Sequence, residues 1–363
     1  MSFPFRVYHH HDMKEWLARL LSRKGLEDIM DSTLKRAAAA PPSTVSDVWD
    51  APIFRDLYLK NGTRFVEPPD EEGRYIFGLA VDSFNPFSNK QAKQQASVTA
   101  IYLYCLNLPP HLRYLPENMY LVGIIPGPHK PSVDQINHFI QLLVDELLVF
   151  WDPGVFYSRT AKYPEGRLVR CALGPLVCDL PAARQVSGYG AHNARYFCSV
   201  CKLPRKDINE VTDPESWPPR SRDDHRSAAT AWKESTTTRG RKNEFAKHSI
   251  RWSPLLDLPY WDPIQFTVID SMHNHYLGLL KHHCRSIWGM DEAAGQGDDE
   301  ESPSRPSPKE IAAGLQTLYT GTELQLARCK RAVLMHLCSL MQLHPGKGDK
   351  KHLLKELMIW VGP

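Results

Sequence analysis

Residues 74–87 read "RYIFGLAVDSFNPF", an apolar run that ends in Asp82 and is followed at once by a turn. The run predicts a buried strand, and the Asn-Pro pair after it predicts the turn. An acid at the end of such a strand has two interpretations. It caps the turn through hydrogen bonds to its own backbone, or it offers hard oxygen ligands to Mg²⁺ beside a cleft.

Further apolar runs of the same kind follow along the chain. Residues 133–151 carry apolar side chains at helical spacing, with Ser132 in place as the N-cap. Strands that alternate with a helix predict a mixed α/β fold. The predicted strands lie in "SVTAIYLYCLNLP" (97–109), "MYLVGIIPGP" (119–128) and "RLVRCALGPLVCD" (167–179).

The last of these runs delivers a second acid, Asp179, for which two compatible roles are open. With Pro181 in the first helical turn, Asp179 fits the N-cap of a helix. If Asp82 and Asp179 meet at one edge of a sheet, they form the pair of carboxylates that two-metal phosphoryl transfer requires.

Cys198 and Cys201 form a C-x2-C pair, which is half of a tetrahedral zinc site. Two buried reduced thiols or a redox dithiol are the alternatives. The missing half is expected in "DSMHNHYLGLLKHH" (270–283), where His273 and His275 are the candidates. On a helix these two point in different directions, so His282 or Cys284 would replace one of them there. Surface histidines on an amphipathic helix are the alternative.

The composition fits a soluble, intracellular protein of 363 residues, with 42% hydrophobic residues. No leader peptide or membrane span is expected. The 44 Lys and Arg against 41 Asp and Glu give a net charge of +3, too balanced to indicate a nucleic-acid partner. Eight cysteines with one close pair favour metal binding or reduced thiols over disulfides.

The segments on either side of the predicted core differ from it in composition. In the first of them, the spacing of apolar residues over Asp12–Met30 predicts one amphipathic helix. The chain is expected to divide into a polar N-terminal segment (1–73), a core (74–203), a polar insertion (204–249), a continuation of the core (250–290), an acidic linker (291–309) and a helical unit (310–363).

The last unit contains two predicted amphipathic helices joined by "HPGKGDKK" (344–351). Four lysines surround this turn, and lysines at a helix N-terminus can meet phosphates of nucleic acid. A solvated helical hairpin is the alternative. The candidate nucleic-acid contacts are Lys347, Lys350, Lys351 and Lys355.

Several ordered segments of the chain together resemble the central region of CACTA (En/Spm-type) transposases, particularly those of fungi. The resemblance covers roughly residues 74–290 and rests on "AVDSFNPFSNK", "NLPPHLRYLPENMYLVGIIPGPHKPSVDQINHFIQLLVDEL", "CDLPAARQVSGYGAHNARYFCSVCKLP", "RWSPLLDLPYWDP" and "IDSMHNHYLGLLKHH". It implies a ribonuclease-H-like mixed sheet with helices and a zinc-knuckle insertion. It also implies an acidic triad that binds two Mg²⁺ or Mn²⁺ ions to cut and rejoin DNA.

The resemblance assigns roles to individual residues. Asp82 is the first acid, in a motif where Ser83 replaces the family's Gly, and Asp179 is the second, in Asp-Leu-Pro-Ala. The family places a Glu on a late helix as the third acid, but no Glu occurs from Asp270 to Met290, so this acid is unassigned.

The knuckle after the second acid is similar to that of the V(D)J recombinase catalytic subunit, which implies that Cys198, Cys201 and His273 bind zinc. The C-terminal hairpin is similar to the SAP-type hairpins that bind the DNA backbone.

The expected function is that of a nuclear, transposase-derived protein that cuts transposon ends and joins them to target DNA, and a homo-oligomer is compatible with it. The alternative is a catalytically inactive, domesticated DNA- or protein-binding module that keeps the fold and the zinc site.

Overall fold

The computed structural model describes residues 6–39, 42–86, 97–209, 213–290, 306–341, 343 and 349–361. These residues fall into two compact units, Met1–Gly289 and Met290–Pro363. Within the described residues, no helix combines the length and the apolar character needed to cross a membrane.

A six-stranded mixed sheet forms the centre of the first unit, in the order β3-β2-β1-β5-β4, with β6 also paired to β5. β1, β2 and β3 are antiparallel neighbours, whereas β5 runs parallel to both β1 and β6. The prediction of a mixed α/β fold is therefore confirmed. The strands are β1 (Gly73–Phe84), β2 (Val98–Cys105), β3 (Met119–Ile125), β4 (Val155–Tyr157), β5 (Arg167–Cys178) and β6 (Thr267–Ile269).

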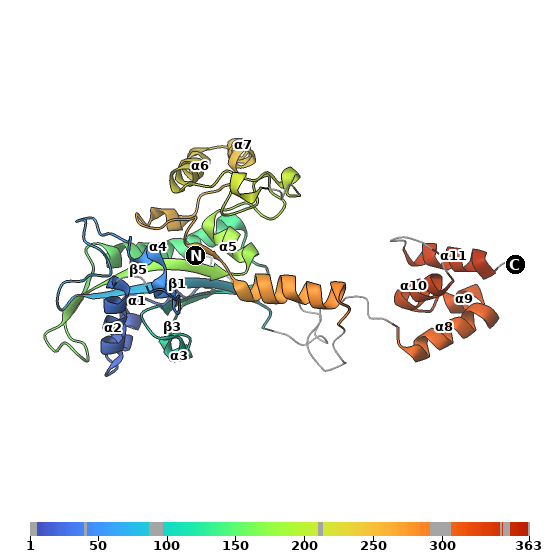
Figure 1. The fold of residues 1–363 in the computed structure, drawn as a ribbon, viewed down its shortest axis with the longest axis horizontal. Helices are drawn as coiled ribbons and strands as arrows, with labels where there is room; N and C mark the ends of the chain where they lie inside the picture. The colour runs from blue at the N-terminus through green and yellow to red at the C-terminus, as the bar shows by residue number, and fades with distance from the viewer. Residues whose placement is uncertain are drawn as a thin grey trace, which may run out of the picture. The chain divides into compact units, whose positions relative to one another are not determined.

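Helices cover both faces of this sheet, and Figure 1 shows α4 and α5 along one side and α2 along the other. α4 (Val133–Trp151) begins as predicted, because the Ser132 side chain accepts from the Gln135 backbone N–H in a capping box. The remaining helices of the unit are α1 (Met13–Leu21), α2 (Leu26–Ala38), α3 (Pro110–Arg113), α5 (Leu180–Ser187), α6 (Arg222–Glu234) and α7 (Thr238–His248).

Shorter helical turns and two π-helical segments complete the unit. The 3₁₀ turns are η1 (Val48–Asp50), η2 (Pro52–Phe54), η3 (Pro116–Asn118), η4 (Arg205–Asp207), η5 (Pro214–Ser216) and η6 (Pro254–Asp257). The π-helical segments are η7 (Met272–Leu280) and η8 (His283–Ile287).

The prediction of a single helix over Asp12–Met30 is wrong, because the structure has two helices, α1 and α2. Gly25 lies between them with φ +85°, a left-handed conformation that glycine adopts without a Cβ clash. The turn lets both helices bury their apolar sides in the same core. Leu17, Leu21 and Met30 are each almost fully buried there.

A buried ion pair ties α2 to the sheet. The Arg167 side chain on β5 is 2% exposed and donates to Glu27 Oε1 at 3.1 Å, with Asp31 3.2 Å away. Arg167 also donates to the Tyr75 hydroxyl at 3.2 Å. These contacts join α2, β1 and β5 at the amino-terminal end of β5.

The second unit is a small helical cluster around its own core. Its helices are α8 (Pro308–Thr320), α9 (Glu323–Leu326), α10 (Arg331–Leu340) and α11 (Lys350–Val361). Their inward side chains include Leu318, Leu334, Leu337 and Leu353, all buried. Most of the predicted acidic linker, residues 291–305, lies outside the described residues.

Candidate active site

The register of β1 against β5 changes by one residue before the two strands reach Asp82 and Asp179. Gly73 to Phe77 of β1 pair with Val169 to Leu173 of β5, but Leu79 pairs with Leu176, so the register shifts by one residue. When the register at Leu79 is continued to the end of β1, Asp82 lies opposite Asp179. In the register before the shift, Asp82 would lie opposite Cys178. The bulge therefore brings Asp82 and Asp179 to the same register position at the carboxyl edge of the sheet.

Asp179 acts as the N-cap of α5, as predicted. Its Oδ1 accepts from the Ala182 backbone N–H at 2.7 Å, and Pro181 occupies the first helical turn. Capping fixes the carboxylate at the strand-to-helix junction while leaving lone pairs on both oxygens for a further partner.

Asp82 lies on an exposed position near the end of β1. No hydrogen bond or ion pair engages its carboxylate within the described part of the chain. Its charge acts on the neighbouring strand β2. There, burial raises the pKa of Tyr102, and the Asp82 charge raises it further. Among the described residues, no hydrogen bond supports the turn-cap interpretation of Asp82, and both interpretations of this acid stay predictions.

A third aspartate, Asp270, completes this edge, and the sequence interpretation missed it. Cys178 pairs with Ile269 at the ends of β5 and β6, and Asp179 and Asp270 are the residues that directly follow these two strands. The signal was present in "FTVID" (266–270), another apolar run that ends in Asp. The family's third acid is a Glu on a late helix, whereas Asp270 directly follows a strand.

The charges of all three aspartates act on the Cys178 thiol. Burial raises the pKa of the Cys178 thiol to about 12, and the charges of Asp179, Asp82 and Asp270 add to the shift. Burial opposes ionisation of Asp270, but its hydrogen bonds with His273 and the Met272 backbone N–H hold its pKa below the usual value. The edge therefore carries concentrated negative charge that a divalent cation would neutralise.

The donor set fits Mg²⁺ or Mn²⁺ in chemistry, since all three side chains offer hard oxygen ligands. Among the described residues, however, no three His, Cys, Asp or Glu side chains lie close enough together to hold one metal ion. The Asp270 carboxylate instead faces His273. Metal binding at this edge therefore requires the side chains to rotate toward one another.

Cys198 and Cys201 form a tight turn with the two thiols as neighbours. Cys198 Sγ accepts from the backbone N–H groups of Val200 at 3.3 Å and Cys201 at 3.4 Å. Burial raises the pKa of Cys201, and the adjacent Cys198 sulfur adds to the shift. A bound cation would reverse this effect, because thiolates are the form that binds metal.

The predicted histidine ligands lie on the π-helical segments. His273 and His275 are exposed on η7, His282 is exposed just before η8, and Cys284 on η8 is half-buried. The His273 ring Nδ1 bonds to the Asp270 carboxylate, which leaves Nε2 available. Two residues apart on a helix, His273 and His275 point in different directions. The structure does not group either of them with the knuckle, so the zinc assignment stays a prediction.

The candidate DNA contacts of the C-terminal unit lie on α11. Lys351 and Lys355 are exposed one helical turn apart, and Lys350 is half-buried. Lys347 lies outside the described residues. Asp349 accepts from the His352 backbone N–H at 2.8 Å and so starts the helix.

Residues 55–212 match the model of the transposase family tnp2. The matched region contains β1 to β5, α3 to α5 and the knuckle, and with them Asp82, Asp179 and both cysteines. Asp270 lies beyond its end. This part of the chain therefore supports assignment to a transposase family. A comparison with curated proteins finds no match.

Proposed function

We propose that the protein is a transposase of the CACTA (En/Spm) type, with a ribonuclease-H-like core that cuts DNA and transfers the cut strand. The observation that carries the proposal is the alignment of three aspartates at the carboxyl ends of three adjacent parallel strands, β1, β5 and β6. Two of them lie within the region that matches a transposase family. The antiparallel β1-β2-β3 meander, continued by parallel strands, supports the ribonuclease-H-like assignment.

Asp82, Asp179 and Asp270 are the residues that would hold two Mg²⁺ or Mn²⁺ ions. When bound, such ions activate the attacking oxygen and stabilise the leaving oxygen of a phosphodiester. The chain's own contribution is to fix Asp179 through the α5 cap, and no described residue is hydrogen-bonded to the Asp82 carboxylate. The substrates on this proposal are transposon ends and target DNA, in the nucleus, with a homo-oligomer as the assembly that would hold two ends.

A structural Zn²⁺ at Cys198 and Cys201 belongs to the same proposal. Its remaining ligands would come from His273 and His275, or from His282 or Cys284 in place of one of them. The support is the knuckle turn, in which the Cys198 sulfur accepts from the backbone N–H groups of Val200 and Cys201.

Asp82→Asn tests the catalytic assignment. The amide keeps the size of the side chain but removes the charge, so we expect Mg²⁺-dependent nicking of supercoiled DNA to fall by at least about a hundredfold. Because Asp82 is exposed, the melting temperature should stay within about 1 °C of the wild type. Asp145→Asn, which changes an exposed acid on α4, should leave nicking unchanged.

Undiminished nicking by Asp82→Asn would refute the catalytic assignment. The alternative function is an inactive DNA- or protein-binding module, and the observation that favours it is the lack of a three-residue metal group among the described residues. That alternative predicts no nicking by the wild type with either Mg²⁺ or Mn²⁺, together with DNA binding that survives EDTA.

A further inference from the structure

A cavity of about 450 Å³ lies in the insertion, between the segment after the knuckle, α6 and the end of α7. Its volume is in the range of small-ligand sites, roughly 300–1,000 Å³. None of the three aspartates lines it. The polar and charged side chains around it include Lys202, Arg220, Asp224, His225, Lys247 and His248.

His225 lines this cavity with two unsatisfied ring nitrogens. The residue is 1% exposed, and no described residue is hydrogen-bonded to its Nδ1 or Nε2. Burial, and then the charges of Arg220 and Arg226, lower its pKa to about 3, so the ring is neutral at pH 7 and carries one N–H. Leaving a buried polar group without a partner destabilises the fold, and a polar ligand in the cavity would remove that penalty.

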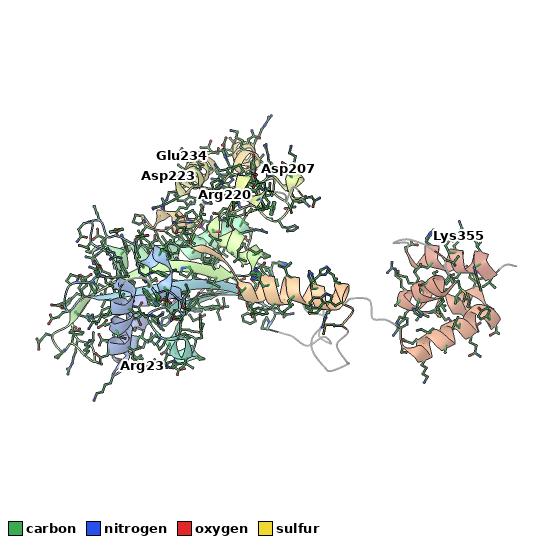
Figure 2. The ribbon with its side chains drawn as sticks, viewed as in Figure 1. Arg23, Asp207, Arg220, Asp223, Glu234 and Lys355 are labelled. Atoms are coloured by element: carbon green, nitrogen blue, oxygen red, sulfur yellow. The ribbon has the colours of Figure 1, made fainter. Side chains whose placement is uncertain are left out.

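Arg220 supplies a buried positive charge beside His225. The residue is 8% exposed, and its Nε and Nη2 donate to the backbone carbonyls of Cys198 at 2.7 Å and Tyr196 at 3.1 Å. Within the described residues, no carboxylate pairs with it. Figure 2 labels Arg220 beneath α6 and α7. A buried cation without a counter-ion is costly, and the open side of its guanidinium faces a cavity that could supply one.

The other charges of the lining are already compensated. Lys202 pairs with Asp224 across the cavity, and Lys247 pairs with Glu244 at 2.6 Å. The Asp224 carboxylate would repel an anion, but the Lys202 ammonium offsets its charge. Among the described residues, Arg220 is therefore the charged side chain of the cavity lining that has no ion-pair partner. Its positive charge favours an anionic ligand.

We propose that this cavity is a phosphate-binding site that holds one phosphodiester of DNA apart from the three aspartates. That the ligand is DNA rests on the proposed function. That the ligand is an anion follows from the side chains that line the cavity. The remaining N–H groups of the Arg220 guanidinium would donate to the phosphate oxygens, and so would the His225 N–H. Such contacts position a DNA strand but do not depend on its base sequence.

Binding of a fluorescein-labelled DNA duplex, measured by anisotropy in EDTA at several salt concentrations, tests this site. We expect Arg220→Gln to weaken binding about tenfold or more and to reduce the slope of log K against log salt by about one contact. Arg205→Gln removes the same charge from an exposed position of the same insertion, outside the cavity, and serves as the matched control. Equal effects of the two variants on affinity and slope would overturn the proposal.

His225→Phe provides a second test, because Arg220 also braces the knuckle backbone. Phenylalanine fills the space without unpartnered polar atoms, so the variant should melt at or above the wild-type temperature at pH 7 while binding DNA several-fold more weakly. Inorganic phosphate should raise the melting temperature of the wild type more than chloride at equal ionic strength, and this difference should vanish in the variant.

Wild-type DNA affinity in His225→Phe, or no phosphate-specific stabilisation of the wild type, contradicts the site. Both measurements are made without divalent metal, so neither depends on the ions that Asp82 would hold, and the Asp145→Asn protein should pass them unchanged. Loss of nicking with retained phosphate binding, or the reverse, therefore separates failure of the catalytic proposal from failure of this one.

Discussion

At the residue scale, one oxygen of the Asp179 carboxylate caps α5, and on the proposed function the same carboxylate also holds a metal ion. The two tasks respond differently to substitution. Asparagine caps a helix about as well as aspartate, whereas alanine does not cap it at all. The pair of variants therefore separates the structural role from the chemical one.

Asp179→Asn should retain stability within about 1 kcal/mol of the wild type, while Asp179→Ala should lose about 1 kcal/mol or more, since it removes the cap. Both should lose metal-dependent nicking. Urea unfolding and the nicking assay measure the two effects. Nicking by Asp179→Asn at the wild-type rate would show that the carboxylate serves only the helix.

His225 determines a pH dependence at the same scale. An unfolded histidine takes up a proton near pH 6.5, but the buried ring does so only near pH 3, so the unfolded state binds more protons between these values. Stability is therefore lost as the pH falls through this window. Relative to His225→Phe, the wild type should lose roughly 3 kcal/mol between pH 6.5 and pH 4 in urea titrations. Parallel losses in both proteins would contradict the assignment.

At the scale of elements, the contact between α2 and β5 carries a buried charge network. Glu27 is 1% exposed, and its two oxygens accept from Arg167 and from the Lys162 backbone N–H at 3.0 Å. Removing one partner leaves the other buried without compensation, which costs about 3–5 kcal/mol when no other group substitutes. Asp31 is the group that can substitute in part.

We therefore expect Glu27→Gln to lower the free energy of unfolding by about 2–3 kcal/mol. Glu15→Gln on α1 is the matched control, since its pair with Arg19 is exposed and 4.0 Å long, and should change stability by less than about 0.5 kcal/mol. Guanidinium unfolding followed by circular dichroism gives both values. A loss below 1 kcal/mol for Glu27→Gln would mean that Asp31 alone satisfies Arg167.

At the scale of the whole molecule, the chain divides into a sheet-containing unit and a helical unit, each with its own core. A division of tasks follows on the proposed function: the first unit performs the chemistry and the second adds contacts to the DNA backbone. Lys351 and Lys355 are the exposed side chains on which the second task depends.

The double variant Lys351→Gln, Lys355→Gln should weaken DNA binding and lower the salt slope by one to two contacts, with nicking at saturating DNA nearly unchanged. Lys309→Gln, Arg328→Gln removes the same charge from exposed positions of the same unit, away from α11. Anisotropy titrations compare the two double variants. Identical slopes would indicate that α11 is a solvated helix with no DNA role.

Local patterns in the sequence determined much of this protein. The strands around Ala80, Leu103 and Val169, the start of α4 at Ser132 and the Asp179 cap all follow from alternation and capping, which act over a few residues. The candidate acids Asp82 and Asp179 were visible for the same reason, since each ends an apolar run.

The tertiary structure alone decided the arrangement of the site. A one-residue shift between Phe77 and Leu79 sets Asp82 opposite Asp179, and the pairing of β6 with β5 brings Asp270 alongside them. Likewise, only packing makes His225 a buried ring without partners. Register between parallel strands depends on crossover connections and bulges rather than on neighbouring residues, so no local pattern in the sequence could specify which acids would meet.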